Sequence, residues 1–341
     1  MARVAETAAM KIKILLIVVS TCFILDSALG QGALTPPGAP APTMRTLDQL
    51  DAKLEKRAPI SAVPFTITQP GSYYLTTNVF ASSNAIVITA NGVALDLGGW
   101  TIFSTATNAF NGGTAILLNG GVRNVTIQNG FIQGGVTNNG SGFFSGGGFT
   151  SGITYSSSPA ANVLVAKVSV FGCQTSGIYF GNGDSTVVES CTVRSVGING
   201  ITASTVKACG SADCGNQAIS GDVVSDCRGA AIGNSVAIVA TTAQNCFGYG
   251  SGNCGGISAS TAQNCFGQSS GSGYGILAAT AQNCVGFANG SGTGIIASDV
   301  AIGCRGQSAT GTGLSAFIAN SCHGVSTSGT ALSTTHNVNS F

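Results

Sequence analysis

The pentapeptide Thr-Ala-Gln-Asn-Cys occurs unchanged at residues 242–246, 261–265 and 280–284, and its cysteine belongs to a longer repeating series. Successive cysteines of this series are separated by 18, 18, 18, 19, 19, 19, 20 and 18 residues. Self-similarity at a fixed period is the sequence signature of a repeat architecture. The members of the series, which we call the ladder cysteines, are Cys173, Cys191, Cys209, Cys227, Cys246, Cys265, Cys284, Cys304 and Cys322.

The period of the repeat limits the folds that it can form. Each unit contains short β-branched runs and Gly/Ser turns, but no helical periodicity. Parallel strands of an ordinary sheet are joined by crossovers of about a dozen residues or more, usually a helix, for which these units have no room. The sequence therefore predicts a solenoid, in which each strand pairs with its equivalent one coil later. The valine or alanine three residues before each ladder cysteine then forms an inward-facing row, at a spacing of about 4.8 Å.

The residues before the ladder follow the same pattern with longer units. Short apolar runs alternate with turn dipeptides such as Asn91-Gly92 and Asn129-Gly130. We expect long coils over residues 65–172 and short coils over residues 173–341, about 13 in total and about 60 Å in length at the usual strand spacing. The predicted fold class is therefore all-β, a parallel β-helix.

The first 64 residues differ from this body. Residues 1–30 contain a basic start, an apolar stretch and small residues near Gly30, which is the pattern of a cleaved secretory signal peptide. Residues 31–44 are proline-rich and predict an extended linker. Residues 45–64 begin with an amphipathic pattern, which predicts a short helix that caps the solenoid, followed by an entry segment. We expect a secreted or cell-surface protein with no transmembrane span after signal cleavage.

Several segments of the chain carry a resemblance to a known family. They are Ile-Thr-Gln-Pro-Gly-Ser-Tyr-Tyr-Leu at 67–75, Val-Ala-Leu-Asp-Leu-Gly-Gly-Trp-Thr-Ile at 93–102 and Asn-Val-Thr-Ile-Gln-Asn-Gly-Phe-Ile at 124–132. Over about residues 35–341 the chain resembles the parallel β-helix proteins of the pectin-lyase-like superfamily, and within it an uncharacterised branch of secreted bacterial proteins. The resemblance implies a right-handed coil, but no single activity, because this fold carries unrelated functions.

The composition weighs against nucleic-acid binding and against catalysis. Charged residues make up 7% of the chain and the net charge is +1, so no basic surface for nucleic acid is expected. Hydrolysis of a sugar polymer would need two carboxylates about 5–9.5 Å apart, yet residues 65–341 contain few acids and none adjacent in sequence. Asp184, Glu189 and Arg194 are the one acid-rich patch with a nearby cation, and are therefore the candidate catalytic residues of a lyase.

The cysteines allow three interpretations. Zinc would need a compact Cys/His cluster, but His323 and His336 lie far from the closest cysteine pair, Cys209 and Cys214, so we expect no metal and no cofactor. Disulfides suit a secreted chain, but ladder cysteines in register would fit disulfide geometry poorly. We therefore expect buried free thiols that act as small apolar side chains. Cys214 and Cys254 lie off the ladder, in predicted turns, and are the candidates for an occasional bridge.

Two features are candidate ligand surfaces. Residues 134–152 form a glycine-rich insertion with Phe143, Phe144 and Phe149, whose rings could stack on sugars. The stacked threonines of the pentapeptide raise ice binding as an alternative. We predict a non-catalytic scaffold that binds extracellular polysaccharide, and the alternative is a polysaccharide lyase or glycoside hydrolase. The C-terminal end has no predicted cap, so self-association there is a further expectation.

Overall fold

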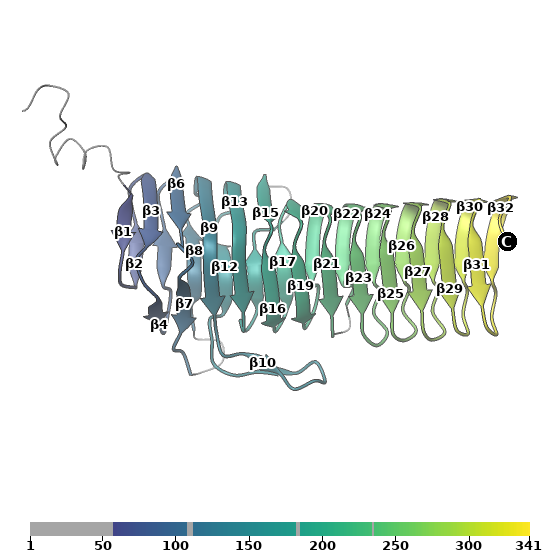
Figure 1. The fold of residues 1–341 in the computed structure, drawn as a ribbon, viewed down its shortest axis with the longest axis horizontal. Helices are drawn as coiled ribbons and strands as arrows, with labels where there is room; N and C mark the ends of the chain where they lie inside the picture. The colour runs from purple at the N-terminus through teal and green to yellow at the C-terminus, as the bar shows by residue number, and fades with distance from the viewer. Residues whose placement is uncertain (1–56, 108–111, 182–184, 234) are drawn as a thin grey trace, which may run out of the picture. The chain divides into compact units, whose positions relative to one another are not determined.

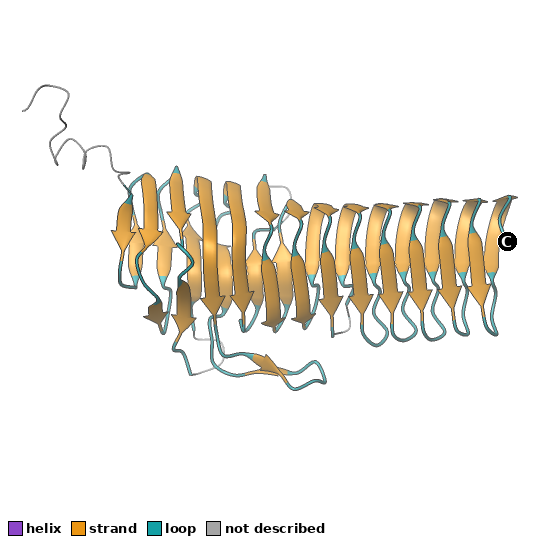
Figure 2. Cartoon of the chain, viewed as in Figure 1, coloured by secondary structure: helices purple, strands orange, loops and turns teal. Residues whose placement is uncertain are grey.

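The chain forms a solenoid built from strands. Arg57–Phe341 is one compact unit, and every regular element among its described residues is a strand (Figure 1, Figure 2). In the same residues, we find no helix with the length and hydropathy that a membrane span requires. The predicted signal peptide, linker and capping helix fall outside the described part of the chain. The residues that the computed structural model describes are 57–107, 112–181, 185–233 and 235–341.

Three stacks of parallel strands follow one another along the solenoid, and we call them face I, face II and face III. Face I precedes the ladder cysteines, and its pairings join strands of 14 successive coils. Its strands are β1 (Ala58–Ile60), β3 (Gly71–Leu75), β6 (Val93–Asp96), β9 (Arg123–Gln133), β13 (Ala161–Phe171), β15 (Thr186–Glu189), β18 (Thr205–Lys207), β20 (Ile219–Ser225), β22 (Ile238–Gln244), β24 (Ile257–Gln263), β26 (Ile276–Gln282), β28 (Ile295–Ile302), β30 (Leu314–Asn320) and β32 (Leu332–Val338).

Face II follows the ladder cysteines, after the chain has turned a corner. The second halves of β9 and β13 belong to it, because their pairing continues around that corner. Its other strands are β4 (Val79–Ala81), β7 (Thr101–Ser104), β16 (Thr192–Val196), β19 (Gly210–Cys214), β21 (Arg228–Ala231), β23 (Phe247–Gly250), β25 (Phe266–Ser269), β27 (Val285–Ala288), β29 (Arg305–Ser308) and β31 (His323–Ser326).

Face III completes each coil and leads into face I of the next. From β20 onward the first half of each long strand lies on face III and its second half on face I. The separate strands of face III are β2 (Phe65–Ile67), β5 (Ile86–Ile88), β8 (Thr114–Asn119), β12 (Ser151–Ser156), β14 (Ser176–Tyr179) and β17 (Asn199–Thr202).

One insertion leaves this regular path between β9 and β12. It contains the short antiparallel strands β10 (Thr137–Asn138) and β11 (Phe144–Ser145), and we call residues 134–148 the arm. Figure 1 shows the arm extending along the solenoid, away from the coil from which it starts. The glycine-rich insertion of the sequence is therefore a structured element with neighbours far along the chain.

The in-register repeat confirms the predicted solenoid. Thr242 pairs with Thr261 and Thr261 with Thr280, and the alanine and glutamine of the pentapeptide keep the same register. The valines and alanines three residues before the ladder cysteines are all buried in the core. The solenoid has 14 coils where about 13 were expected, and it begins at β1 rather than at residue 65. The pairing of β1 with β3 adds this first coil.

The asparagines of the pentapeptide hold the corner between face I and face II. Asn245, Asn264 and Asn283 have φ angles of 53°, 52° and 51°. Asparagine tolerates this left-handed conformation better than most residues, because its short polar side chain bonds locally. Asn264 Nδ2 donates a hydrogen bond to Asn245 Oδ1 at 3.3 Å. These amides therefore stabilise the turn between the two faces.

The ladder cysteines are free and line the interior at the same corner. All 11 cysteines in the described residues are buried and unpaired, as expected for thiols that fill the core. From Cys191 onward each ladder cysteine donates to backbone oxygens: Cys246 Sγ lies 3.1 Å from the Gln244 carbonyl and 3.4 Å from that of Val224. Cys214 closes β19 instead of lying in a turn, because the strand extends further than its sequence indicates.

Thiol counting tests this arrangement. A thiol reagent applied in denaturant without reductant should label all 11 cysteines of residues 57–341, whereas the native chain should react slowly because these cysteines are buried. Peptide mass spectrometry assigns each label, and each disulfide would lower the count by two.

The pH dependence of stability gives a second test. Burial raises the pKa of Cys173 and of Cys214 to about 12 each. In the unfolded chain a thiol ionises near pH 8.5, so above this pH unfolding releases protons that the folded state retains. The free energy of unfolding should therefore fall as the pH rises from about 8.5 towards 12. Urea titrations across this range should show a shallower fall for Cys173→Ala than for the wild type, and equal slopes would contradict the assignment.

Candidate functional site

Two of the three residues of the predicted catalytic patch, Glu189 and Arg194, lie on different faces of the solenoid. Glu189 ends β15 on face I, where it pairs in register with Lys207 of the next coil. Arg194 lies beyond the corner, in β16 on face II. Asp184 falls outside the described residues. No hydrogen bond or ion pair links Glu189 to Arg194 or Lys207, all three of which are described, so the geometry gives them no common site.

The three phenylalanines of the insertion have three different environments. Phe149 is completely buried in the core, which corrects the expectation that its ring faces a ligand. Phe149 directly follows the arm, and its buried side chain anchors the return of the chain to β12. Phe144 is half-buried and packs over Gly215. The packing is tight, because a Cβ atom placed on Gly215 would lie only 3.1 Å from the Phe144 ring. Phe143 remains 66% exposed. Only one ring of the predicted sugar platform is therefore available to a ligand.

Several acidic side chains have structural partners. Asp96 accepts a hydrogen bond from the Gly98 amide at 2.9 Å, which orders the turn after β6, and forms a 3.0 Å ion pair with Arg57. Asp226 accepts a hydrogen bond from Asn245 at 3.0 Å. Among the described residues, no three His, Cys, Asp or Glu side chains lie close enough together to hold a metal ion.

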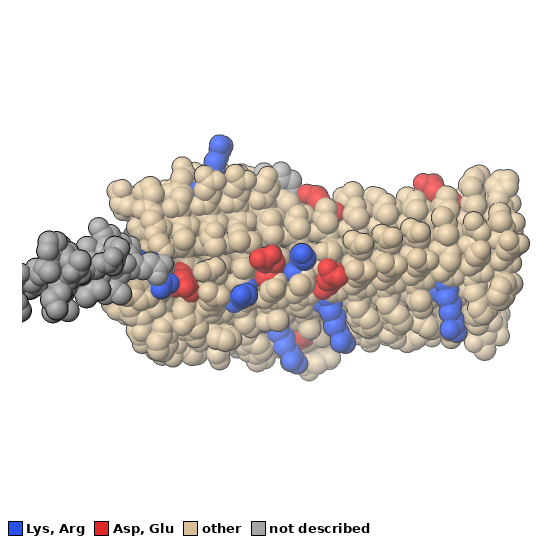
Figure 3. Space-filling view, turned by 45° about the horizontal axis from the view of Figure 1, so that its top comes forward, with Lys and Arg blue, Asp and Glu red and all other residues tan. Residues whose placement is uncertain are grey.

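The pentapeptide threonines lie on face I and form a short hydroxyl row. Val223 precedes Thr242 in the row and Val300 follows Thr280. The hydroxyl groups therefore extend over three coils before aliphatic side chains interrupt them. Figure 3 shows that charges are scarce on the C-terminal half of the solenoid, and after Arg228 the sequence holds only Asp299 and Arg305. Ice binding by this row stays an untested alternative.

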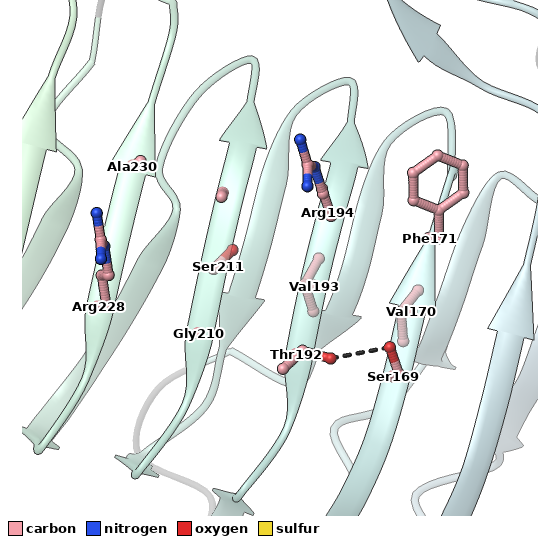
Figure 4. Close-up of a pocket in the computed structure, with 11 residues that line it drawn as sticks. Ser169, Val170, Phe171, Thr192, Val193, Arg194, Gly210, Ser211, Arg228 and Ala230 are labelled. Carbon is pink, nitrogen blue, oxygen red and sulfur yellow. Dashed lines mark hydrogen bonds between the residues drawn. The ribbon is translucent and has the colours of Figure 1, made fainter.

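Face II carries a surface that the sequence analysis missed. Its outward positions form two rows in which large side chains predominate. In the coils of β19 and β21 these give way to Gly210, Ala212 and Ala230. This gap in the rows produces a groove of about 360 Å³. Its lining residues, most of them labelled in Figure 4, are Ser169, Val170, Phe171, Thr192, Val193, Arg194, Gly210, Ser211, Ala212, Arg228 and Ala230.

Two exposed arginines flank the small residues of the groove. Arg194 pairs in register with Ala212, and Arg228 with Gly210, so the arginines are two coils apart, or about 9.6 Å at the usual strand spacing. In Figure 4 both side chains stand out from the strands on the same face. Among the described residues, no carboxylate forms an ion pair with Arg194 or Arg228. The groove therefore presents two guanidinium groups that can accept an anion.

The walls of the groove add an apolar and a hydroxyl contact. The Phe171 side chain is 37% exposed at one end of the groove. Thr192 Oγ1 donates a hydrogen bond to Ser169 Oγ at 2.8 Å, which orients two hydroxyl groups beside it (Figure 4). At the other end, the Arg228 guanidinium lies 4.8 Å from the Phe247 ring centroid, a cation–π contact. This contact fixes Arg228 and leaves Arg194 the freer of the two cations.

Beyond Arg228 the aromatic row serves the fold more than a ligand. The Phe247 and Phe266 rings stack with centroids 5.1 Å apart and an interplanar angle of 4°. Because their faces are turned toward one another, these rings present mainly edges to solvent, and a sugar has little free face on which to stack. One sequence signal could have revealed this surface. The residue directly after each ladder cysteine points outward on face II, and it is Arg228 in one coil and Phe247 in the next.

Comparison with known proteins gives one structural likeness. No family model and no curated protein matches the chain. Among solved structures, the chain is similar to the A-module of the mannuronan C-5 epimerase AlgE4 from Azotobacter vinelandii, with a TM-score of 0.43 and 11% sequence identity. The alignment covers 79% of this chain and 90% of that chain. The parallel pairings of its own strands place this chain among the parallel β-solenoids.

Proposed function

We propose that this protein is an extracellular scaffold that binds an acidic polysaccharide in the face II groove without chemically altering it. The observation that carries the proposal is the groove itself, with Arg194 and Arg228 exposed over a floor of small residues. The predicted signal peptide supports the extracellular location. The open, elongated face supports a polymer rather than a small enclosed ligand.

The chemistry of the groove fits uronate residues. Guanidinium groups bind carboxylates through paired N–H donors, with a planar geometry that lysine does not offer. The Phe171 ring offers apolar area for the C–H groups of a sugar, and the Ser169 and Thr192 hydroxyls offer hydrogen bonds. Because both arginines lie on one side of the solenoid, a chain running parallel to its axis could contact both of them.

The same lining supports binding rather than catalysis. A lyase or hydrolase needs a group that takes or gives a proton near neutral pH, most often a carboxylate or an imidazole. The lining residues include no Asp, Glu or His. Arginine stays protonated under ordinary conditions and is a poor general base. The alternative of a polysaccharide lyase or glycoside hydrolase has less support, because Glu189 and Arg194 lie on different faces.

Substitution of the two arginines tests the proposal. Each exposed charge pair contributes up to about 1 kcal/mol, so Arg194→Ala with Arg228→Ala should weaken binding of an oligogalacturonate about 30-fold. Isothermal titration calorimetry gives the affinity, with Lys207→Ala as a control, since Lys207 is an exposed cation on face I. A neutral dextran should not bind. Equal affinity of wild type and double variant, or release of reducing ends or unsaturated sugars, would overturn the proposal.

A further inference from the structure

Asp213 lies next to the groove but does not face Arg194 as a partner. It follows Ala212, the residue that pairs with Arg194 in register. The pairing of β19 with β21 shifts register between Ser211 and Cys214, and Asp213 has a φ of 57°. A β-bulge of this kind redirects a side chain. The bulge thus places a carboxylate one residue from the cationic groove while turning it to another neighbour.

That neighbour is the arm. Asn138 Nδ2 in β10 donates a hydrogen bond to Asp213 Oδ1 at 2.6 Å. Ser195 Oγ, which follows Arg194 in β16, donates to Asp213 Oδ2 at 2.6 Å. Each carboxylate oxygen therefore has a donor, one from the arm and one from the solenoid, and hydrogen bonds to a charged acceptor are stronger than those between neutral groups.

We propose that Asn138 is a positioning residue that keeps the Asp213 carboxylate on the arm, so that the Arg194 guanidinium stays available to an acidic ligand. This inference rests on the proposed function of the groove and assigns the arm a role in it. Asn138 acts through Asp213 and does not line the groove. The arm thereby sets the anion affinity of the groove indirectly.

The electrostatic reason is a competition for one cation. Without the Asn138 amide, the Asp213 carboxylate keeps a single side-chain donor, Ser195, and gains by turning toward Arg194 in the neighbouring strand. An ion pair at such an exposed position is worth up to about 1 kcal/mol. A ligand carboxylate would have to displace this Asp213–Arg194 ion pair. A cost of about 1 kcal/mol corresponds to an affinity for the ligand that is about fivefold lower.

A second attachment allows this role to be separated from docking of the arm. Phe144 packs over Gly215 and Gly197, and a Cβ at Gly215 would also clash with the Gly197 carbonyl. Gly142 at the tip lies beside Ile232: a Cβ atom added there would be in ordinary van der Waals contact with the Ile232 side chain, at 3.7 Å. The Phe144 contact does not involve Asn138.

Asn138 Oδ1 also accepts hydrogen bonds from the Gly140 and Gly142 amides, at 3.0 and 3.1 Å. Replacing Asn138 therefore removes the bond to Asp213 and these two bonds at the tip of the arm, but leaves the Phe144 contact in place. A loss of affinity caused by the tip persists when Asp213 is replaced as well, whereas a loss caused by the released carboxylate does not.

A double-mutant cycle tests the proposal through ligand affinity. Asn138→Ala should weaken oligogalacturonate binding about fivefold, whereas Asp213→Asn should bind at least as well as wild type because the competing charge is gone. The double variant should bind like Asp213→Asn, since there is no carboxylate left to release. Ser145→Ala, an exposed change elsewhere on the arm, is the control and should bind like wild type. A loss from Asn138→Ala that persists in the Asp213→Asn background would overturn the proposal.

A measurement without ligand separates this inference from the proposed function. Phenylglyoxal modifies free guanidinium groups, and peptide mass spectrometry follows Arg194 and Arg228 in the same sample. Asn138→Ala should slow modification of Arg194 severalfold, the double variant should restore it, and Arg228 should not change. This pattern without glycan binding would retain the positioning role and reject the ligand. Unchanged Arg194 reactivity in Asn138→Ala would reject the positioning role even if the wild type binds oligogalacturonate.

Discussion

Every coil of this protein depends on the hydrogen bonds that pair a strand with its equivalent one coil later. Because the pairing is in register, each side chain stands beside the residue of the same rank in the next coil, at about 4.8 Å. Each residue type must therefore pack well against the same type of residue in the adjacent coil. Alanine, valine and the ladder cysteines do so inside the core, and asparagine does so at the corner, where Asn264 bonds to Asn245. Like charges would repel one another at this spacing, which explains why so few residues are charged.

The same constraint decides where a ligand can bind. Rows of large side chains make a closed surface, and a groove forms on face II where Gly210, Ala212 and Ala230 replace them. The arginines on either side face no carboxylate in the rows themselves. The acid that comes nearest in register, Asp213, lies on a bulge and bonds to Asn138 and Ser195. The small residues that interrupt the rows thus produce the groove. The bulge at Asp213 keeps a carboxylate away from the arginines of the groove.

The sequence was sufficient for the solenoid because its period is a local property. The spacing of the ladder cysteines predicted the coil, the inward row and the free thiols, and the strand pairings confirm them. The functional surface depends on which residues become neighbours across coils, and the irregular lengths of the early coils hide this register. Arg194 was singled out beside Glu189 because the two are close in sequence, yet the corner at Cys191 separates them.

The arm could not be placed from sequence for a related reason. Its glycines allow many paths, and its partners Asp213 and Gly215 are some 75 residues away, as the Asn138–Asp213 bond shows. The burial of Phe149 depends on the same path, because the chain must re-enter the core before β12. Neither fact leaves a periodic signal in the sequence.

The arm also changes how the molecule would respond to a pulling force. In a solenoid each coil contacts its two neighbours, so strands can be peeled from an end one coil at a time. The arm leaves the coil of β9 and rests on residues that follow β16, β19 and β21, thereby tying together coils that do not touch. Peeling from the C-terminal end would proceed in small steps until it reached β21. There the arm and the coils beneath it would have to separate together, as a mechanical clamp.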